Sequence, residues 1–205
     1  MLKLHDVTYS YPDSDRPVIE HIDLCIDKGD IIRIAGRNGA GKSTLLKVIA
    51  GELPVSSGWI ERKQGLRCVY LDQFSGDMLP MDLTLLEVWS AFRKPSDKND
   101  NGSALREMMS KFGIGLEERT MAFCGELSGG ERQILALGVA VASGFDLLCL
   151  DEFTSNLDSA AEVLAQDLML ACAKDRSGAI CFISHREIEL NENKTIALSG
   201  VKSHE

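Results

Sequence analysis

The stretch GRNGAGKST, Gly36 to Thr44, decides the fold of this chain. It fits the pattern G-x-x-x-x-G-K-[ST], in which glycines let the backbone curl until its N–H groups point inward around phosphates. The apolar run before it, residues 30–36, predicts a buried strand, and residues 42–51 show helical spacing that stops at a glycine. A strand, a glycine loop and a helix in this order predict a nucleotide site, because the positive end of the helix faces the phosphates.

The side chains of this loop, called the phosphate loop below, suit separate tasks in binding a nucleotide. Lys42 offers a positive charge to the β- and γ-phosphates, and the Ser43 hydroxyl is expected to face Mg²⁺. The alternative is a glycine-rich turn without a ligand, which the flanking strand and helix disfavour. The residues predicted to bind the nucleotide in this loop are Gly36, Arg37, Asn38, Gly39, Ala40, Gly41, Lys42, Ser43 and Thr44.

Outward from the loop, the sequence predicts an α/β fold with a mainly parallel sheet. Residues 2–27 alternate and are rich in β-forming residues, with a turn at Pro12 and Asp13, which predicts an N-terminal antiparallel β region. Further along, continuous apolar strands alternate with helices, a pattern typical of a parallel sheet covered on both faces. The strands predicted for this sheet are residues 30–36, 65–73, 145–152 and 178–185, and a long amphipathic helix is predicted at residues 159–175.

The chain is long enough for one domain with a small appended lobe. Residues 74–125 have a helical pattern of their own, interrupted by the polar stretch RKPSDKNDNGS at residues 93–103. We therefore predict a single domain over residues 1–205, in which residues 1–73 and 126–205 form the catalytic core and the helical stretch between them forms a small α-helical subdomain.

Composition and charge exclude several classes of function. The formal net charge of −9, with a pI of about 5.0 and no Lys/Arg run, excludes general nucleic-acid binding. The N-terminus lacks a basic stretch followed by an apolar one, so we expect no signal peptide and a cytosolic location. The apolar stretch at residues 134–150 is shorter than the roughly 20 residues that a spanning helix needs, and is interpreted as a helix end, a turn and a core strand.

The cysteines are predicted to be free, buried thiols rather than zinc ligands or disulfides. They form no C-x-x-C pair, and several lie in apolar runs, where free cysteine behaves as a small hydrophobic residue. A cytosolic location also disfavours disulfides. The six residues are Cys25, Cys68, Cys124, Cys149, Cys172 and Cys181.

A pair of carboxylates ends the predicted strand in LLCLDE, residues 147–152. Ligands bind at the carboxyl ends of strands in open α/β sheets, so Asp151 is predicted to hold Mg²⁺ through water, as the strand-end aspartate does in P-loop NTPases. The adjacent Glu152 is costly beside a γ-phosphate unless it polarises the attacking water. A merely solvated acidic pair is the alternative, and it is disfavoured in a chain that carries the phosphate loop.

With LSGGE at residues 127–131 added, these motifs resemble the ATP-binding cassette (ABC) ATPases, and the match covers nearly the whole chain. The resemblance implies a P-loop NTPase core of the RecA-like kind, with ATP as the nucleotide and its hydrolysis as the reaction. Three further family features are matched in the right order: a glutamine after the strand that follows the phosphate-loop helix, an S-x-L-D loop after the acidic pair, and a histidine that ends the next strand. The matching residues are Gln73, then Ser155, Leu157 and Asp158, then His185.

The resemblance also implies roles for single residues. The family has an aromatic that stacks on adenine, and Tyr11 fits best, with Tyr9 two residues away and simple packing of either ring as alternatives. Outside the phosphate loop, the implied nucleotide contacts are Tyr11, Ser128, Gly129, Gly130 and Asp158. The implied Mg²⁺ ligands are Ser43, Gln73 and Asp151, and the implied catalytic residues are Glu152, His185, Gln73 and Lys42.

Two positions depart from the family pattern. Phe153 stands where the family usually has a proline, which bears on the rigidity of the turn and removes no catalytic atom. The helix after LSGGE lacks the family's second arginine, which leaves its polar contacts open.

The family's partners are implied in the same way. The turn from Ser128 to Gly130 of one subunit is expected to cap the γ-phosphate held by Lys42 of a second copy or of a homologous ATPase subunit. An integral-membrane permease subunit is expected to insert a helix near Gln73 and to hold the chain on the inner face of the cell membrane. The apolar residues available for that groove, with core packing as the alternative, are Phe74, Met78, Leu79, Met81 and Trp89.

The sequence thus favours the ATP-hydrolysing subunit of a membrane transporter. One alternative is a soluble ABC-type ATPase that serves a cytosolic assembly process. Another is a clamp that binds ATP without turnover, against which Glu152 argues, and a GTPase is disfavoured because no N-K-x-D motif is present. The transported substrate is not encoded in these motifs, and the lack of an accessory domain slightly favours export.

Overall fold

The computed structural model describes residues 1–14, 16–92, 102–111, 118–175, 178–184 and 193–198. Its first sheet is antiparallel, with strand order β2-β1-β4. The strands are β1 (Leu2–Tyr9), β2 (Ile19–Ile26) and β4 (Ser57–Arg62). Buried residues alternate along β1, so one face of this sheet packs on the core and the other faces solvent.

The second sheet is parallel and has the strand order β5-β6-β7-β3-β8. All five residues of β6 and of β7 are buried, as expected for central strands that helices cover on both faces. The strands are β3 (Ile31–Gly36), β5 (Cys68–Asp72), β6 (Leu147–Asp151), β7 (Ala179–Ile183) and β8 (Lys194–Leu198).

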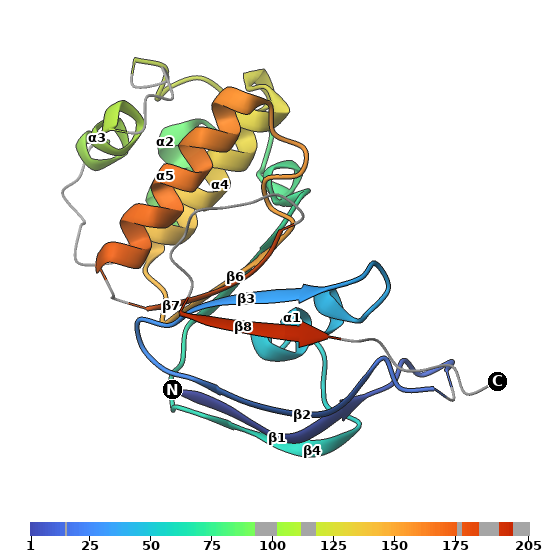
Figure 1. The fold of residues 1–205 in the computed structure, drawn as a ribbon. Helices are drawn as coiled ribbons and strands as arrows, with labels where there is room; N and C mark the ends of the chain where they lie inside the picture. Colours follow the sequence, from blue (N-terminus) through green and yellow to red (C-terminus); the bar gives the residue numbers. More distant parts are fainter. Residues whose placement is uncertain (15, 93–101, 112–117, 176–177, 185–192, 199–205) are drawn as a thin grey trace.

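The helices form layers on the two faces of the parallel sheet (Figure 1). Helix α1 (Lys42–Ala50) lies between the two sheets, and α4 (Gly129–Ser143) and α5 (Ser159–Asp175) cover the opposite face. Neighbouring side chains of β6 point to opposite faces of the sheet. Cys149 belongs to the hydrophobic cluster that includes α1, and Leu148 belongs to the hydrophobic cluster that includes α4 and α5.

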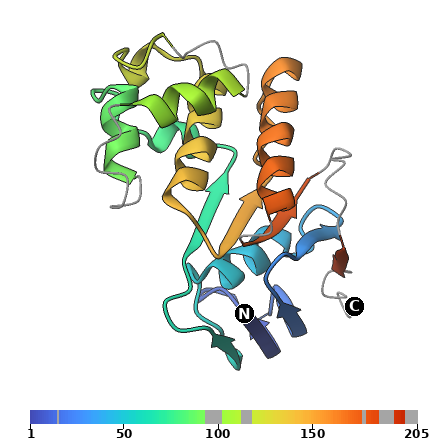
Figure 2. The ribbon, with the colours of Figure 1, turned by 90° about the vertical axis from the view of Figure 1, so that its left-hand side faces the viewer.

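A third hydrophobic cluster lies in the helical part of the chain. Figure 2 shows these helical segments at the opposite end of the molecule from the antiparallel sheet. The cluster contains buried residues of α2 (Leu85–Phe92) and α3 (Ser103–Lys111). Leu135 and Val139 of α4 belong to it as well, whereas other faces of α4 pack with α5. Helix α4 therefore connects the helical part to the parallel sheet. The exact limits of a helical subdomain at residues 74–125 stay a prediction.

The predicted α/β fold with an N-terminal antiparallel region is confirmed, and so is the interpretation of residues 134–150 as the end of α4, a turn and β6. Two strands were missed. In β4, exposed and half-buried residues replace an apolar run, and β8 is an edge strand with no fully buried residue. Within the described residues, no helix is long and apolar enough to span a bilayer.

All six cysteines are free thiols, and four of them are buried, as predicted. The prediction of buried thiols is wrong for Cys25, which is exposed, and Cys68 is half-buried. Cys25 is exposed because successive side chains of a strand point to opposite faces, and its neighbour Ile26 is the one that faces the core.

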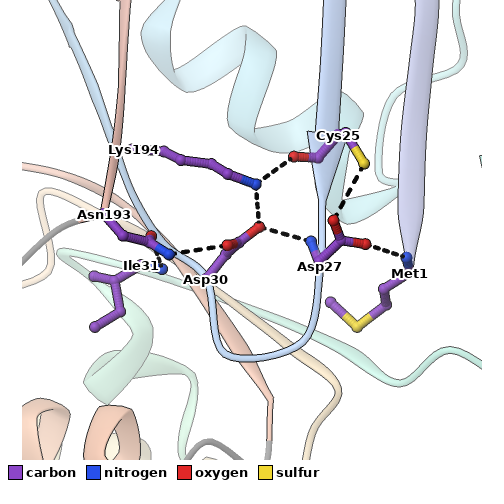
Figure 3. A network of polar contacts seen from close by, with 7 residues as sticks. All are labelled: Met1, Cys25, Asp27, Asp30, Ile31, Asn193 and Lys194. Atoms are coloured by element: carbon purple, nitrogen blue, oxygen red, sulfur yellow. Dashed lines mark hydrogen bonds and ion pairs between the residues drawn. The ribbon is translucent and has the colours of Figure 1, made fainter.

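A polar network closes the end of the parallel sheet that lies opposite the phosphate loop (Figure 3). The buried carboxylate of Asp30 accepts hydrogen bonds from the Asp27 amide at 2.7 Å, from Asn193 Nδ2 at 3.0 Å and from Lys194 Nζ at 2.5 Å. Lys194 Nζ also donates to the Cys25 carbonyl at 3.2 Å. This network joins the start of β8 to the turn between β2 and β3.

Replacing Asp30 with asparagine is expected to lower the free energy of unfolding by about 2 kcal/mol near neutral pH, because charge-assisted hydrogen bonds are lost. Burial acts to raise the pKa of Asp30, but the hydrogen bonds from Lys194, the Asp27 amide and Asn193 outweigh it and set this pKa below its ordinary value of 3.8. A lowered pKa stabilises the fold above about pH 4 and ceases to do so as the pH falls through the folded-state pKa.

Urea unfolding of parent and variant between pH 3 and pH 7 measures this difference, which should shrink below about pH 4. Asp27→Asn is the matched control, since this carboxylate is exposed and its loss should have little effect. A pH-independent difference for Asp30→Asn would contradict the assignment.

Candidate functional site

The phosphate loop connects β3 to α1 and borders a pocket of about 300 Å³. Gly41 stands at the N-cap of α1 with φ of +90°, and a Cβ on it would lie 2.8 Å from the Val18 carbonyl oxygen. Gly41 has no side chain that could cap the first amides of this helix, so their N–H groups are available to an anion. The pocket is lined by Val18, Asn38, Gly39, Gly41, Lys42, Ser43, Thr44 and Glu152.

Lys42 is buried and folds back over its own loop. Its Nζ donates hydrogen bonds to the carbonyl oxygens of Gly36 at 3.1 Å and Arg37 at 3.2 Å. These two carbonyls hold the ammonium group at the wall of the pocket, where its charge faces any bound phosphate.

Ser43, which lines the pocket, contacts Asp151 from a distant segment of the sequence. The Ser43 hydroxyl donates to Asp151 Oδ1 at 3.1 Å, and the Tyr70 hydroxyl donates to Asp151 Oδ2 at 2.8 Å. Parallel pairing in register places Asp72 opposite Asp151, which brings the ends of β5 and β6 to the same edge. A hydroxyl and a carboxylate at this edge form the all-oxygen donor set that Mg²⁺ prefers, so the residues present fit the ion.

Glu152 follows β6 directly and borders the pocket. Its φ of +48° is in the left-handed region, which a residue with a side chain adopts at a cost of about 1 kcal/mol or more. The conformation is fixed on both sides: the Glu152 amide donates to the Ile183 carbonyl at 3.1 Å, and the Glu152 carbonyl accepts from the Ser155 amide at 2.9 Å. Strain that the surroundings maintain in this way is typical of functional positions.

Gln73 lies directly after β5, and the structure joins it to the loop that follows Glu152. Its Oε1 accepts a hydrogen bond from Ser155 Oγ at 2.9 Å. Gln73 is not part of the described pocket wall that contains Ser43. Asp158, in the same loop, accepts from the Ala161 amide at 2.8 Å and so caps the first turn of α5.

The two candidate tyrosines differ in burial. Tyr9 belongs to the core, whereas Tyr11 is 43% exposed and meets the Tyr9 ring edge-on at 5.1 Å between centroids. The Tyr11 hydroxyl lies 3.2 Å from Thr44 Oγ1, beside the phosphate loop. Tyr11 therefore remains the candidate for contact with an adenine ring.

The turn from Ser128 to Gly130, called the signature turn below, forms the N-terminus of α4. Ser128 and Glu131 make a capping box: Ser128 Oγ accepts from the Glu131 amide at 3.2 Å, and Glu131 Oε2 accepts from the Ser128 amide at 2.7 Å. The box does not use the amides of Gly129 and Gly130. Helix α4 begins at the helical end of the molecule, away from the loop between β3 and α1 (Figure 1).

The structure thus brings Lys42, Ser43, Asp151 and Glu152 together and places the signature turn elsewhere. His185 lies outside the described residues. Sequence reasoning missed Tyr70 and Gln133, which contact the segments around Asp151 and Glu152. For Tyr70 the only signal was its place in a strand that ends at this edge, which does not tell which residue of a neighbouring strand it reaches. For Gln133 the sequence carried no comparable signal.

Tyr70→Phe is expected to raise the Mg²⁺ concentration needed for half-maximal ATP hydrolysis about tenfold, the usual effect of removing a partner that orients a metal ligand. Burial, and then the hydrogen bond and charge of Asp151, raise the pKa of Tyr70 far above its ordinary value, so the phenol stays a donor at all working pH values. Binding of Mn²⁺ with ATP, followed by electron paramagnetic resonance, should weaken in parallel. Tyr9→Phe is the control, and equal metal affinity in the Tyr70 variant would contradict the prediction.

Comparison with known proteins gives four findings. A family model described as ABC transporter matches residues 19–155. The zinc import ATP-binding protein ZnuC of Ruegeria sp. (strain TM1040) is 36% identical over 193 residues, which covers 91% of this chain and 73% of that protein. Among solved structures, an inward-facing transporter assigned to the metal-chelate ABC type has a TM-score of 0.75 at 26% identity, covering 96% of this chain and 79% of that chain.

A second solved structure shares the fold. It is a dimeric ATP-binding cassette in a post-hydrolysis state, bound to ADP and Pi. Its TM-score is 0.76 at 21% identity, and the alignment covers 97% of this chain and 94% of that chain.

Proposed function

Because the chain belongs to the ABC transporter family, we propose that two copies of it close around two ATP molecules and so drive a membrane permease. As a member of this family the chain binds ATP with Mg²⁺ and hydrolyses it. The pairing, the roles of single residues and the identity of the partner are proposals, and the geometry of the site supports them as follows.

The observation that carries the proposal is the presence of two helix N-termini with available amides, placed apart in one chain. The first, at α1, suits the phosphates of a bound ATP. The second, at the signature turn, lies away from it and suits an anion that another molecule presents. A head-to-tail pair with two-fold symmetry satisfies both, since each signature turn then meets the γ-phosphate held by the other subunit.

Single residues divide the chemistry. Lys42 binds the β- and γ-phosphates, and Ser43 and Asp151 hold Mg²⁺, which neutralises charge on the transferred phosphoryl group. Glu152 orients and deprotonates the attacking water, assisted by Gln73 and His185. Tyr11 stacks on adenine, and Asp158 contacts the nucleotide from the loop after Glu152.

The free energy available from two bound ATP molecules is sufficient to switch the pair between its open and closed states. Moving the pair from about 1:99 to 99:1 closed takes roughly 5.5 kcal/mol, or about 2.7 kcal/mol for each of two ATP molecules. Charge-assisted hydrogen bonds from helix amides contribute about 1.5–3 kcal/mol each, so one or two for each γ-phosphate are enough. Loss of the γ-phosphate removes these bonds, and the pair opens.

The permease is proposed to dock beside Gln73 on exposed apolar side chains. Met78 is 84% exposed, Met121 68% and Phe74 54%. Such high exposure is unusual for several large apolar side chains that lie on neighbouring segments of a protein surface. Trp89, by contrast, is buried in the third cluster and belongs to the core. The proposed docking residues are Phe74, Met78, Met81, Met121 and Phe123.

In this proposal the permease holds the chain on the cytoplasmic face of the membrane, as its relation to transporter ATPases suggests. The bacterial relative is named for zinc import, which favours import over export and makes zinc the first substrate to test.

Purification from detergent-solubilised membranes tests the proposal. The full chain should copurify with an integral membrane protein, and that complex, in lipid vesicles, should hydrolyse ATP faster when its substrate is supplied. Met78→Asp should abolish copurification and leave the ATPase activity of the isolated chain unchanged. Isolation only with a soluble scaffold would overturn the transporter assignment and favour a cytosolic assembly ATPase.

A further inference from the structure

One buried side chain, Gln133, joins the two segments that carry the proposed catalytic residues. Its Nε2 donates to the Asp72 carbonyl at 2.5 Å and to the Phe153 carbonyl at 3.3 Å, and its Oε1 accepts from the Gly76 amide at 2.6 Å. Gln133 is 4% exposed, and its partners Gly76 and Phe153 are buried as well, whereas Asp72 is half-buried. Leaving such backbone groups without a partner is costly, which makes the contact hard to break.

The chemistry of the partners fixes the orientation of the amide. Asp72 and Phe153 present carbonyl oxygens, which only accept, and Gly76 presents an N–H, which only donates. A flipped amide would place its oxygen against two carbonyls and its NH₂ group against an N–H. A side chain that only donates or only accepts cannot satisfy all three partners, so glutamine is suited to this position in a way that leucine or glutamate is not.

The three partners flank the catalytic positions closely. Asp72 immediately precedes Gln73, Gly76 follows it within the turn η1 (Ser75–Met78), and Phe153 immediately follows Glu152. The departure from proline at position 153 keeps the carbonyl contact and adds a buried ring in the core of α4 and α5. The backbone segments that carry Gln73 and Glu152 are therefore both hydrogen-bonded to one side-chain amide on α4, that of Gln133.

The turn η1 is fixed to α4 by packing as well. A Cβ on Gly76 would lie 2.6 Å from the Gln133 backbone nitrogen, so the two segments are in close contact. Arg132 Nη2 adds a hydrogen bond to Asp77 Oδ1 at 3.1 Å. Gln133 lies in the first turns of α4, directly after the signature turn, and a helix transmits a shift of its N-terminus along its axis as a rigid element.

We propose that Gln133 is a positioning residue that couples docking of the signature turn on the partner subunit's ATP to the placement of Gln73 and Glu152 in its own subunit. This inference rests on the proposed two-subunit closure. A shift of α4 on docking moves the Gln133 amide, and the Asp72 and Phe153 carbonyls follow because losing their hydrogen bonds is unfavourable. A subunit that caps the partner's ATP thereby adjusts the geometry for hydrolysis of the ATP that is bound at its own phosphate loop.

Two substitutions at Gln133 test this. Gln133→Leu removes all three hydrogen bonds, and Gln133→Glu keeps the shape but places an acceptor against two carbonyls. At pH 8, both are expected to lower kcat about 10- to 100-fold, the effect of misplacing catalytic groups by about 1 Å, with the KM for ATP and the affinity for a fluorescent ATP analogue within twofold of the parent. Gln166→Leu and Gln166→Glu, at a half-buried glutamine of α5, are the matched controls.

A second readout separates coupling from simple packing. Burial keeps the pKa of a carboxyl group at position 133 high, so lowering the pH from 8 to 6 protonates it and restores a donor. The kcat of Gln133→Glu relative to the parent should therefore rise several-fold over this range, and that of Gln133→Leu should not. In the Glu152→Gln background, both variants should need about tenfold more protein for half-maximal ATP-dependent dimerisation.

The outcomes are distinct. Folded Gln133 variants with parental kcat and dimerisation overturn the inference, and so does a parallel loss of ATP binding, which indicates general damage. A parent chain that neither hydrolyses ATP nor dimerises with it overturns the proposed function instead.

Discussion

Replacing Glu152 with glutamine is expected to lower kcat for ATP hydrolysis at least 100-fold while two subunits still close around ATP. A positioned general base contributes about 10²- to 10⁴-fold, and the amide of glutamine cannot accept the proton of water. The substitution also removes a negative charge beside the γ-phosphate, so the closed pair should last longer. Phosphate release measures the first effect, and size-exclusion chromatography with ATP and Mg²⁺ measures the second.

The backbone around Glu152 should be unchanged by this substitution. Its left-handed conformation is held by the hydrogen bonds to Ile183 and Ser155, which involve main-chain atoms of Glu152 only. Glu61→Gln, on the exposed part of β4, is the matched control and should hydrolyse ATP at the parental rate. Undiminished hydrolysis in the Glu152→Gln variant rules out the role of Glu152 as the general base. A parent protein that dimerises with ATP but never hydrolyses it is a nucleotide-gated clamp and not an ATPase.

The phosphate loop and the strand-end carboxylates could be predicted from sequence because local spacing determines them. The residues from Gly36 to Ser43 form one continuous segment. An apolar strand that ends in Asp151 places the carboxylate at the edge of the sheet through its local sequence alone. The same locality made β3, α1 and β6 predictable. Strands β4 and β8 lack a continuous apolar run, so their pairing depends on neighbours that the sequence does not reveal.

The contacts that organise the site could not be predicted in this way. Tyr70 reaches Asp151 only because β5 and β6 pair in a particular register, and Gln133 reaches Asp72 and Phe153 only because α4 packs against the end of the sheet. Each depends on residues more than 15 positions away in the chain, where spacing carries no information. A sequence motif thus identifies the groups that touch ATP more readily than those that hold them in place.

Replacing Ser128 with arginine is expected to abolish ATP-dependent dimerisation and to lower turnover at least 100-fold, while each subunit still binds ATP at its phosphate loop. The large side chain occupies the position where the γ-phosphate of the partner is proposed to dock. Arginine also has no acceptor for the Glu131 amide, so the capping box is lost and the exposed amides of the first turn of α4 are no longer ordered for an anion.

Ser128→Ala separates the two causes. It removes the same acceptor without adding bulk and should cost about 1 kcal/mol of stability, with dimerisation weakened but present. Ser57→Arg, at an exposed serine of β4, controls for the added charge. If Ser128→Arg is folded, binds ATP and still dimerises with parental turnover, the signature turn does not meet the partner's ATP, and the two helix N-termini of this chain then need separate explanations.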